Sequence, residues 1–227
     1  MLEVRGLTAA YGRARILFGL DFSARRGEVL VLLGHNGAGK STTLKSMMGL
    51  LRDRSGSVSL DGARIDGLPA DRVARRGLGY VPEDRRIFTG LTVLENLEVA
   101  RQPARDGLTP WTPERLFELF PELAPMQARL AAHMSGGEQQ MLAVARTLMG
   151  NPAAILLDEP TEGLAPRVVE RMAATIRALK SEGMCVVLCE QNLRFARAVG
   201  DRACLMERGT IKATGTLDAV RSEYALD

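Results

Sequence analysis

The 227-residue sequence lacks a long apolar run, has few cysteines and carries little net charge. Its longest apolar runs, Val29–Leu33, Ala153–Leu157 and Met184–Cys189, have the length of buried strands, well short of the ~20 residues of a membrane helix. The first residues contain no signal-peptide core, so we expect a cytoplasmic chain. A net charge of +3 is too small to indicate a nucleic-acid partner.

Cysteine and tryptophan are both scarce. Cys185, Cys189 and Cys204 are odd in number and form no CxxC pair, which argues against a disulfide framework or a metal site. The spacing of Cys185 and Cys189 predicts that both point to one face of a buried strand, where they act as small apolar residues. We expect the single tryptophan, Trp111, to serve packing rather than recognition.

What the sequence does have is a glycine-rich segment directly after the apolar run Val29–Leu33. Glycines there let backbone N–H groups point at phosphate oxygens, and the N-terminus of the following helix adds partial positive charge. Lys40 supplies a cation for the β- and γ-phosphates, and the Ser41 hydroxyl suits Mg²⁺. The alternative is a chance glycine-rich loop, but the strand before it and the helix after it favour a nucleoside triphosphate site. The predicted phosphate-binding residues are Gly34, His35, Asn36, Gly37, Ala38, Gly39, Lys40, Ser41 and Thr42.

A second chemical element follows the apolar strand Ile155–Leu157, which ends in Asp158 and Glu159. Such a strand places both carboxylates at the edge of a sheet where α/β proteins bind ligands. Asp158 would hold Mg²⁺, and Glu159 would polarise the water that attacks the γ-phosphate. A strand that simply runs into a charged loop is the alternative, which the phosphate-binding segment makes the weaker interpretation.

The remaining pattern predicts a parallel-sheet α/β core with a helical insertion. Apolar residues at helical spacing mark one helix after the glycine-rich segment and another between the last two long strands. Residues from about 92 to 150 are helical in pattern and are divided by prolines. The predicted elements are, in order, strands with turns over 1–33, a helix with Leu44, Met47, Met48 and Leu51 that is ended by Arg52–Gly56, and strands at Ser57–Leu60, Leu78–Val81 and Ile155–Leu157. They continue with a helix with Val169, Met172, Ile176 and Leu179, a strand at Cys185–Cys189 and a hairpin over Ala203–Ala213.

A third element, Ser135-Gly136-Gly137-Glu138, opens a helix that runs to Gly150. Ser135 can cap this helix, and the two glycines let backbone amides approach an anion. By itself Ser-Gly-Gly is a common turn. Placed shortly before the Asp-Glu strand, it resembles the signature motif of the ATP-binding-cassette (ABC) ATPases, and the resemblance extends over essentially the whole chain.

The resemblance implies a P-loop NTPase fold with a parallel-sheet core, an antiparallel β subdomain and an inserted α-helical subdomain. Residues 1–227 would form a single ABC ATPase domain, with the α/β core at about 1–85 and 151–227 and the helical subdomain at about 86–150. The implied ligands are ATP and Mg²⁺. Two ATPase subunits would close head-to-tail around two ATP molecules, so that residues 135–138 act on the partner's ATP.

Further residues match the family position by position. Tyr11 matches the aromatic residue that stacks on adenine, and Gln191 matches the switch position that contacts the γ-phosphate, beside the catalytic residues Lys40 and Glu159. Glu83 matches the loop that leads into the helical subdomain and joins the implied Mg²⁺ ligands Ser41 and Asp158. Departures from the usual family residues occur at Glu83 (glutamine), Met134 (leucine), Glu138 (glutamine), Ala165 (aspartate) and Gln191 (histidine).

With these departures, the sequence resembles one subfamily of ABC ATPases: the smaller ATPase of branched-chain amino-acid importers and its relatives for urea or short-chain amides. The strings that carry this resemblance are residues 81–88, 160–166 and 189–192. The resemblance implies an importer ATPase at the cytoplasmic face of the bacterial inner membrane. Its partners would be a second ABC ATPase subunit, identical or different, two membrane permeases and, indirectly, a solute-binding protein.

Three other functions are compatible with part of this pattern. A small-metabolite kinase could use the same phosphate-binding segment, but it needs neither Ser-Gly-Gly-Glu nor Asp-Glu-Pro. A soluble ABC protein of translation or DNA repair would carry two cassettes or a long coiled-coil insertion, which 227 residues do not accommodate. An export-type ABC ATPase stays open, because only the resemblance at Glu83 and Gln191 argues against it.

Overall fold

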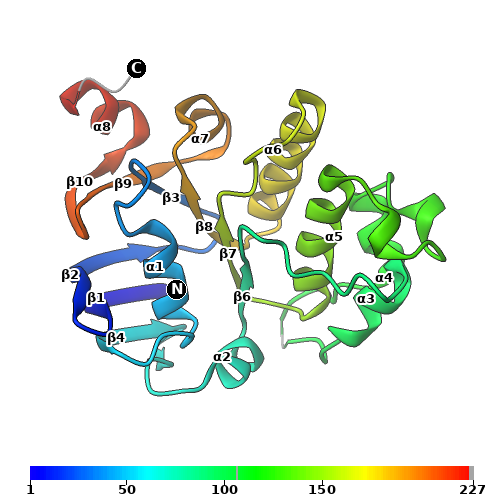
Figure 1. The fold of residues 1–227 in the computed structure, drawn as a ribbon, viewed down its shortest axis with the longest axis horizontal. Helices are drawn as coiled ribbons and strands as arrows, with labels where there is room; N and C mark the ends of the chain where they lie inside the picture. The colour runs from blue at the N-terminus through cyan, green and yellow to red at the C-terminus, as the bar shows by residue number, and fades with distance from the viewer. Residues whose placement is uncertain (106, 225–227) are drawn as a thin grey trace.

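In a computed structural model of the chain, residues 1–105 and 107–224 are described. Strands and helices alternate along most of this length (Figure 1). The strands are Leu2–Tyr11 (β1), Ala14–Ala24 (β2), Val29–Leu33 (β3), Arg54–Leu60 (β4), Ala63–Arg64 (β5), Leu78–Val81 (β6), Ala154–Asp158 (β7), Cys185–Glu190 (β8), Arg202–Glu207 (β9) and Thr210–Thr216 (β10). The helices are Lys40–Met47 (α1), Ala70–Arg76 (α2), Val93–Val99 (α3), Pro113–Leu119 (α4), Gly136–Met149 (α5), Pro166–Ser181 (α6), Leu193–Val199 (α7) and Leu217–Tyr224 (α8), with short 3₁₀ turns at Ala124–Met126 and Ala131–His133.

The strands form two sheets of different character. One is antiparallel and has the order β2-β1-β4-β5. The other has the order β10-β9-β3-β8-β7-β6 and is parallel except for β10, which forms a hairpin with β9. Because β3, β7 and β8 lie side by side and in parallel, their carboxyl ends meet at one edge. Loops that carry polar residues leave the sheet at that edge.

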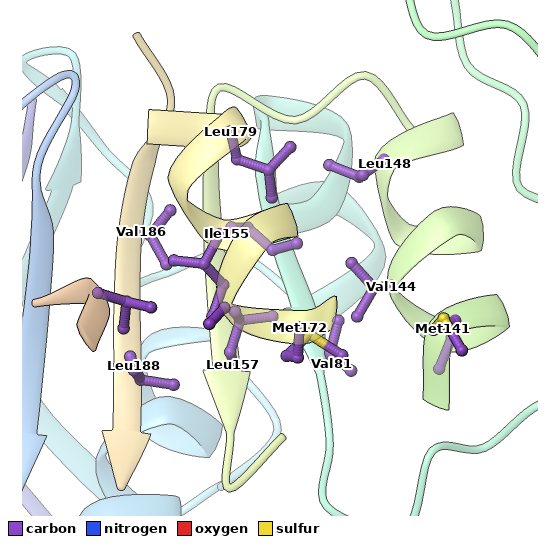
Figure 2. Packing of buried hydrophobic residues seen from close by; sticks show 14 of the residues in the cluster. Val81, Met141, Val144, Leu148, Ile155, Leu157, Met172, Leu179, Val186 and Leu188 are labelled. Carbon is purple, nitrogen blue, oxygen red and sulfur yellow. The ribbon is translucent and has the colours of Figure 1, made fainter. Parts of the chain in front are cut away.

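Alternating residues of the central strands enter two separate hydrophobic clusters. Ile155 and Leu157 of β7 pack with helices α5 and α6 (Figure 2). Leu156, the residue between them, faces the other way, into the cluster shared with α1 and the antiparallel sheet. A parallel strand buried on both faces needs a continuous apolar run, which explains the composition of β3, β7 and β8.

Helices α3, α4 and α5 lie at one end of the molecule, and the antiparallel sheet lies at the other (Figure 1). Helix α5 packs on the central sheet through Val144 and Leu148 (Figure 2). Trp111, just before α4, is buried in the same cluster, so the expected packing role is confirmed. The guanidinium of Arg115 lies 3.9 Å from the centre of the Trp111 ring.

The expected α/β architecture is confirmed, but two boundaries were predicted wrongly. The first helix ends at Met47, so Leu51 lies beyond it and packs against the cluster from the following turn. The strand predicted at Ser57–Leu60 begins earlier, at Arg54, inside the segment Arg52–Gly56 that was expected to end the helix. Gly56 lies inside β4 at φ 100°, opposite an irregularity in β1, and a Cβ there would contact the backbone of Gly6. Glycine at this position therefore allows β4 to approach β1 closely and does not indicate a turn.

Other expectations agree with the structure. The C-terminal hairpin over 203–213 is present and extends from Arg202 to Thr216. Cys185 and Cys189 share one face of β8, in the cluster that also contains Leu156. Within the described ranges, none of the helices combines the length and apolar character that a transmembrane span requires.

Candidate functional site

The phosphate-binding segment connects the end of β3 to the start of α1. Gly37 and Gly39 adopt φ values of 81° and 103°, a left-handed conformation that side chains with a Cβ disfavour. Gly39 occupies the N-cap position of α1 without a side-chain cap. The first backbone N–H groups of α1 therefore have no capping side chain, and this geometry suits an anion.

Lys40, the first residue of α1, folds back over the same loop. It is 4% exposed, and its Nζ donates hydrogen bonds to the carbonyl oxygens of Gly34 (2.7 Å) and His35 (3.2 Å). The same Nζ lies 3.0 Å from Oε1 of Glu159. A buried ammonium with three oxygen partners is held firmly in place and points into the loop, where phosphate oxygens could join or replace those partners.

Asp158 ends β7 and is oriented by two hydroxyl groups. Its Oδ1 accepts a hydrogen bond from Oγ of Ser41 (2.8 Å), and its Oδ2 accepts one from the Tyr80 hydroxyl (3.0 Å). Burial raises the pKa of Asp158, and the two hydrogen bonds lower it in part. Together Ser41 and Asp158 present adjacent hydroxyl and carboxylate oxygens, which are ligands that Mg²⁺ prefers.

Glu159 adopts a left-handed backbone conformation, with φ 45°. Its N–H donates to the carbonyl oxygen of Cys189 at 3.1 Å, which fixes the end of β7 to β8. The side chain is 8% exposed and lies between two groups: Oε1 faces Lys40, and Oε2 accepts a hydrogen bond from Nε2 of Gln191 at 3.1 Å. The structure thus joins Lys40, Glu159 and Gln191 in one chain of polar contacts.

A cavity of about 400 Å³ lies over the loop. Its lining brings together residues that the sequence analysis selected from three separate segments, including Lys40, Ser41, Glu83 and Glu159. Ile16 and Glu162 line it as well. Burial and the nearby carboxylate of Glu159 raise the pKa of Glu162. The cavity therefore combines one lysine with several carboxylates beside a glycine-rich backbone.

Tyr11 lies apart from this cavity. It is 49% exposed at the end of β1 and lines a neighbouring cavity of about 460 Å³ together with Lys45, Glu83 and Asp158. Glu83 and the adjacent loop separate the two spaces, since Glu83 lines both. The position of Tyr11 leaves its ring free to meet a base at the mouth of the site, and its role stays a prediction.

The signature residues 135–138 are absent from the described lining of the phosphate cavity. Ser135 caps α5 in a reciprocal arrangement, because Ser135 N–H donates to Oε2 of Glu138 (2.7 Å) and Glu138 N–H donates to Oγ of Ser135 (3.4 Å). Gly136 faces the Arg85 guanidinium, and a Cβ on Gly137 would press against Val168. The expected cap is confirmed, and the segment is placed on the surface of this chain.

Two residues of the site were missed by the sequence analysis. Tyr80 reaches Asp158 because β6 pairs with β7, and burial and that carboxylate together raise its pKa. Glu190 is buried, accepts a hydrogen bond from Oγ1 of Thr161 (2.6 Å), and also accepts the backbone N–H groups of Gln191 and Asn192 (3.2 and 3.1 Å). An acid at the end of the apolar run 184–189 was the available signal for Glu190.

Comparisons with known proteins identify the family of the chain. Residues 17–162 match the ABC transporter family. The chain is 39% identical to the high-affinity branched-chain amino acid transport ATP-binding protein BraG of Pseudomonas aeruginosa, over 93% of this chain and 91% of that protein. It is 36% identical to the probable branched-chain amino acid transport ATP-binding protein LivF of Archaeoglobus fulgidus (95% and 92% covered). It is 34% identical to the lipopolysaccharide export system ATP-binding protein LptB of Haemophilus influenzae (98% and 93% covered).

Solved structures give the same answer. The ATP-binding subunit of an ABC transporter superposes with a TM-score of 0.83 at 31% identity, covering 100% of this chain and 94% of that one. A dimeric ATP-binding cassette in a post-hydrolysis state, bound to ADP and Pi, superposes with a TM-score of 0.81 at 25% identity, covering 96% and 99%. This chain belongs to the ABC transporter family, and it is an ATPase of the class that couples ATP hydrolysis to transport.

Proposed function

We propose that this chain is the ATP-hydrolysing subunit of an importer for branched-chain amino acids, bound at the cytoplasmic face of the inner membrane. The observation that carries the substrate class is the 39% identity to BraG over almost the full length of both chains. The departures at Glu83 and Gln191 support it, because they resemble the smaller ATPase of such importers. The substrate itself would contact the permeases and not this chain.

In the proposed reaction, the loop amides and Lys40 bind the β- and γ-phosphates, and Tyr11 stacks on adenine. Glu159 accepts a hydrogen bond from the attacking water and polarises it, while Gln191 orients Glu159 and donates to the γ-phosphate. Gln191 can donate through its amide but cannot take up a proton near neutral pH, so general-base work falls to Glu159.

The donor set of the site fits Mg²⁺, because Ser41, Asp158 and the nearby Glu83 offer only oxygen atoms. Among the described residues there is no cluster of three or more His, Cys, Asp or Glu that would hold a metal alone. A site of one hydroxyl and one or two carboxylates suits an ion that is held jointly with nucleotide phosphates. Mg²⁺, when bound, would neutralise charge that develops on the phosphates.

We further propose that two cassettes close head-to-tail, with residues 135–138 of each facing the ATP of the other. The permeases would dock in a groove of about 480 Å³ between the core and α5, lined by Leu50, Arg75, Pro82 and Arg146 among others. Arg75 and Arg146 line this groove, so it offers basic side chains that suit an acidic segment of a permease. Arg75→Glu should reduce co-purification with permeases while the isolated chain hydrolyses ATP normally.

Deletion of the gene followed by uptake assays tests the substrate class. Uptake of radiolabelled leucine, isoleucine or valine should fall, and wild-type chain should restore it while Lys40→Ala and Glu159→Gln should not. The similar identity to LptB makes export of lipopolysaccharide the second candidate. Normal amino-acid uptake together with lipopolysaccharide retained at the inner membrane would favour export and reject import.

A further inference from the structure

The phosphate-binding loop rests on the turn of the C-terminal β9–β10 hairpin, far away in sequence. Gly209, in that turn, donates its N–H to the carbonyl oxygen of Ala38 at 2.9 Å. Its own carbonyl oxygen accepts the N–H of Phe18 in β2, also at 2.9 Å. One residue of the hairpin thus joins the antiparallel sheet to the inner side of the loop.

The turn of the hairpin contacts β2 and the loop through backbone atoms. A Cβ on Gly209 would overlap the carbonyl oxygen of Ile16 and lie 2.8 Å from its carbonyl carbon. A Cβ on Gly34 would overlap the carbonyl oxygen of Met206, at the end of β9, and one on Gly39 would lie 3.6 Å from the Gly209 Cα. Three positions of the loop therefore lie directly against the segment 206–209, and a side chain at position 209 has no space.

The hydrogen bond between Gly209 and Ala38 is important for stability because the Ala38 carbonyl is buried. Ala38 is buried, and losing the Gly209 N–H would leave its carbonyl oxygen without that partner inside the protein. The loop would then turn to find another partner. The direction of its backbone N–H groups, on which anion binding depends, would change with it.

We propose that Gly209 is a positioning residue for nucleotide binding. Through Ala38, the hairpin segment 206–210 fixes the direction of the loop amides that receive the phosphates, and Gly209 itself contacts no phosphate. The inference rests on the proposed assignment of the loop to phosphate binding. It adds a requirement that the motif does not contain, which is a glycine in a separate hairpin.

The chain offers a matched control. Gly209 follows Arg208, with φ values of 46° and 75°, and Gly62 follows Asp61 in the β4–β5 hairpin, with φ values of 49° and 81°. Both are two-residue hairpin turns with the same left-handed backbone. A Cβ on Gly62 would meet nothing within 4 Å. Gly62→Ala therefore imposes the same backbone strain without the collision or the link to the loop.

The test compares Gly209→Ala with Gly62→Ala in the full chain, by titration with ATP, ADP and inorganic tripolyphosphate. Tripolyphosphate has no base, so it reports the phosphate loop alone. For Gly209→Ala we expect all three dissociation constants to rise by at least about tenfold and by similar factors. For Gly62→Ala we expect tripolyphosphate affinity to stay at the wild-type value.

Two results would overturn the proposal. Wild-type tripolyphosphate affinity in Gly209→Ala would show that the hairpin does not position the loop. Weaker ATP and ADP with unchanged tripolyphosphate would show that the hairpin acts on the base through Ile16 and β2. Lys40→Ala separates the two levels of inference: if it leaves tripolyphosphate binding unchanged, the phosphate site itself is wrongly assigned.

If Gly209→Ala fails to fold, amide hydrogen exchange on the wild-type chain takes its place. Tripolyphosphate should slow exchange in peptides that cover 206–210, because the bound loop holds Gly209 more firmly, and should leave 60–63 unchanged. Unchanged exchange over 206–210, with slowed exchange over 34–42, would overturn the proposal.

Discussion

The phosphate loop and the signature segment are built in opposite ways. The loop connects β3 to α1 and contacts the β9–β10 hairpin, and its lysine is buried with three oxygen partners. The signature segment lies at the surface end of α5, where exposed Ser135 exchanges hydrogen bonds with Glu138 in its own first turn. The loop is thus held by contacts with distant parts of the chain, and the signature segment only by contacts within its own first turn.

The difference has a physical basis. A loop that must hold charged phosphates needs its amides fixed before binding, so that the ordering is part of folding. A surface that must meet a second chain can be held by a local cap, since the partner completes the packing. On this view ATP binding belongs to the single chain, and fast hydrolysis belongs to a pair of chains.

The largest effect on ATP hydrolysis is expected from a substitution in the phosphate loop. Lys40→Ala removes the buried cation at the loop, so hydrolysis should be abolished and ATP binding weakened, with the fold retained. Equilibrium titration with ATP, together with phosphate release, measures both. Lys180→Ala is the control: it removes a lysine of α6 that pairs with Asp201, and the variant should bind ATP normally.

Glu159→Gln should separate binding from hydrolysis. The variant keeps the shape of the side chain but loses the carboxylate that polarises water, so turnover should fall by on the order of 10²-fold while ATP still binds. It should also accumulate as an ATP-bound dimer, detectable by size exclusion. Glu162 is a neighbouring carboxylate of the same cavity, so Glu162→Gln is the control and should turn over ATP within a few-fold of wild type. Near-normal hydrolysis by Glu159→Gln would show that Glu159 is not the base.

A mixing experiment tests whether the signature acts on a second chain. Ser135→Arg blocks the surface of α5 and should bind ATP but not hydrolyse it, and Lys40→Ala should be inactive by itself. In a head-to-tail pair, one site would combine the intact loop of the first variant with the intact signature of the second. Mixing the two should therefore recover part of the wild-type turnover, whereas no recovery would mean that the signature does not act across chains.

The smallest effect is expected at Tyr11, at the mouth of the site. Stacking on adenine contributes about 1 kcal/mol, so Tyr11→Ala should raise the ATP dissociation constant several-fold. Tyr11→Phe keeps the ring and serves as the control. Equal affinities for the wild type and both variants would leave Tyr11 as an exposed side chain without a role in base binding.

The sequence predicted the parts of the site that are local. The loop after β3 and the two acids at the end of β7 each follow an apolar run within a few residues, so order along the chain was sufficient to find them. Tyr80 and Gly209 were not predictable in this way, because they reach the site through strand pairing and hairpin packing. The start of β4 was predicted wrongly for the same reason. Gly56 suggests a break in the sequence pattern, but in the structure it lies in the strand, close to the backbone of β1.

The buried thiols make the chain suitable for site-specific labelling. Cys185, Cys189 and Cys204 are all buried, and burial raises the pKa of Cys185 to about 12. A thiol attacks electrophilic reagents as the thiolate, so near neutral pH these cysteines should react with maleimides slowly in the folded state. A cysteine introduced at an exposed position would then carry a spin label or fluorophore without removal of the native three. Distances between two chains could be followed through a turnover cycle on an otherwise unaltered protein.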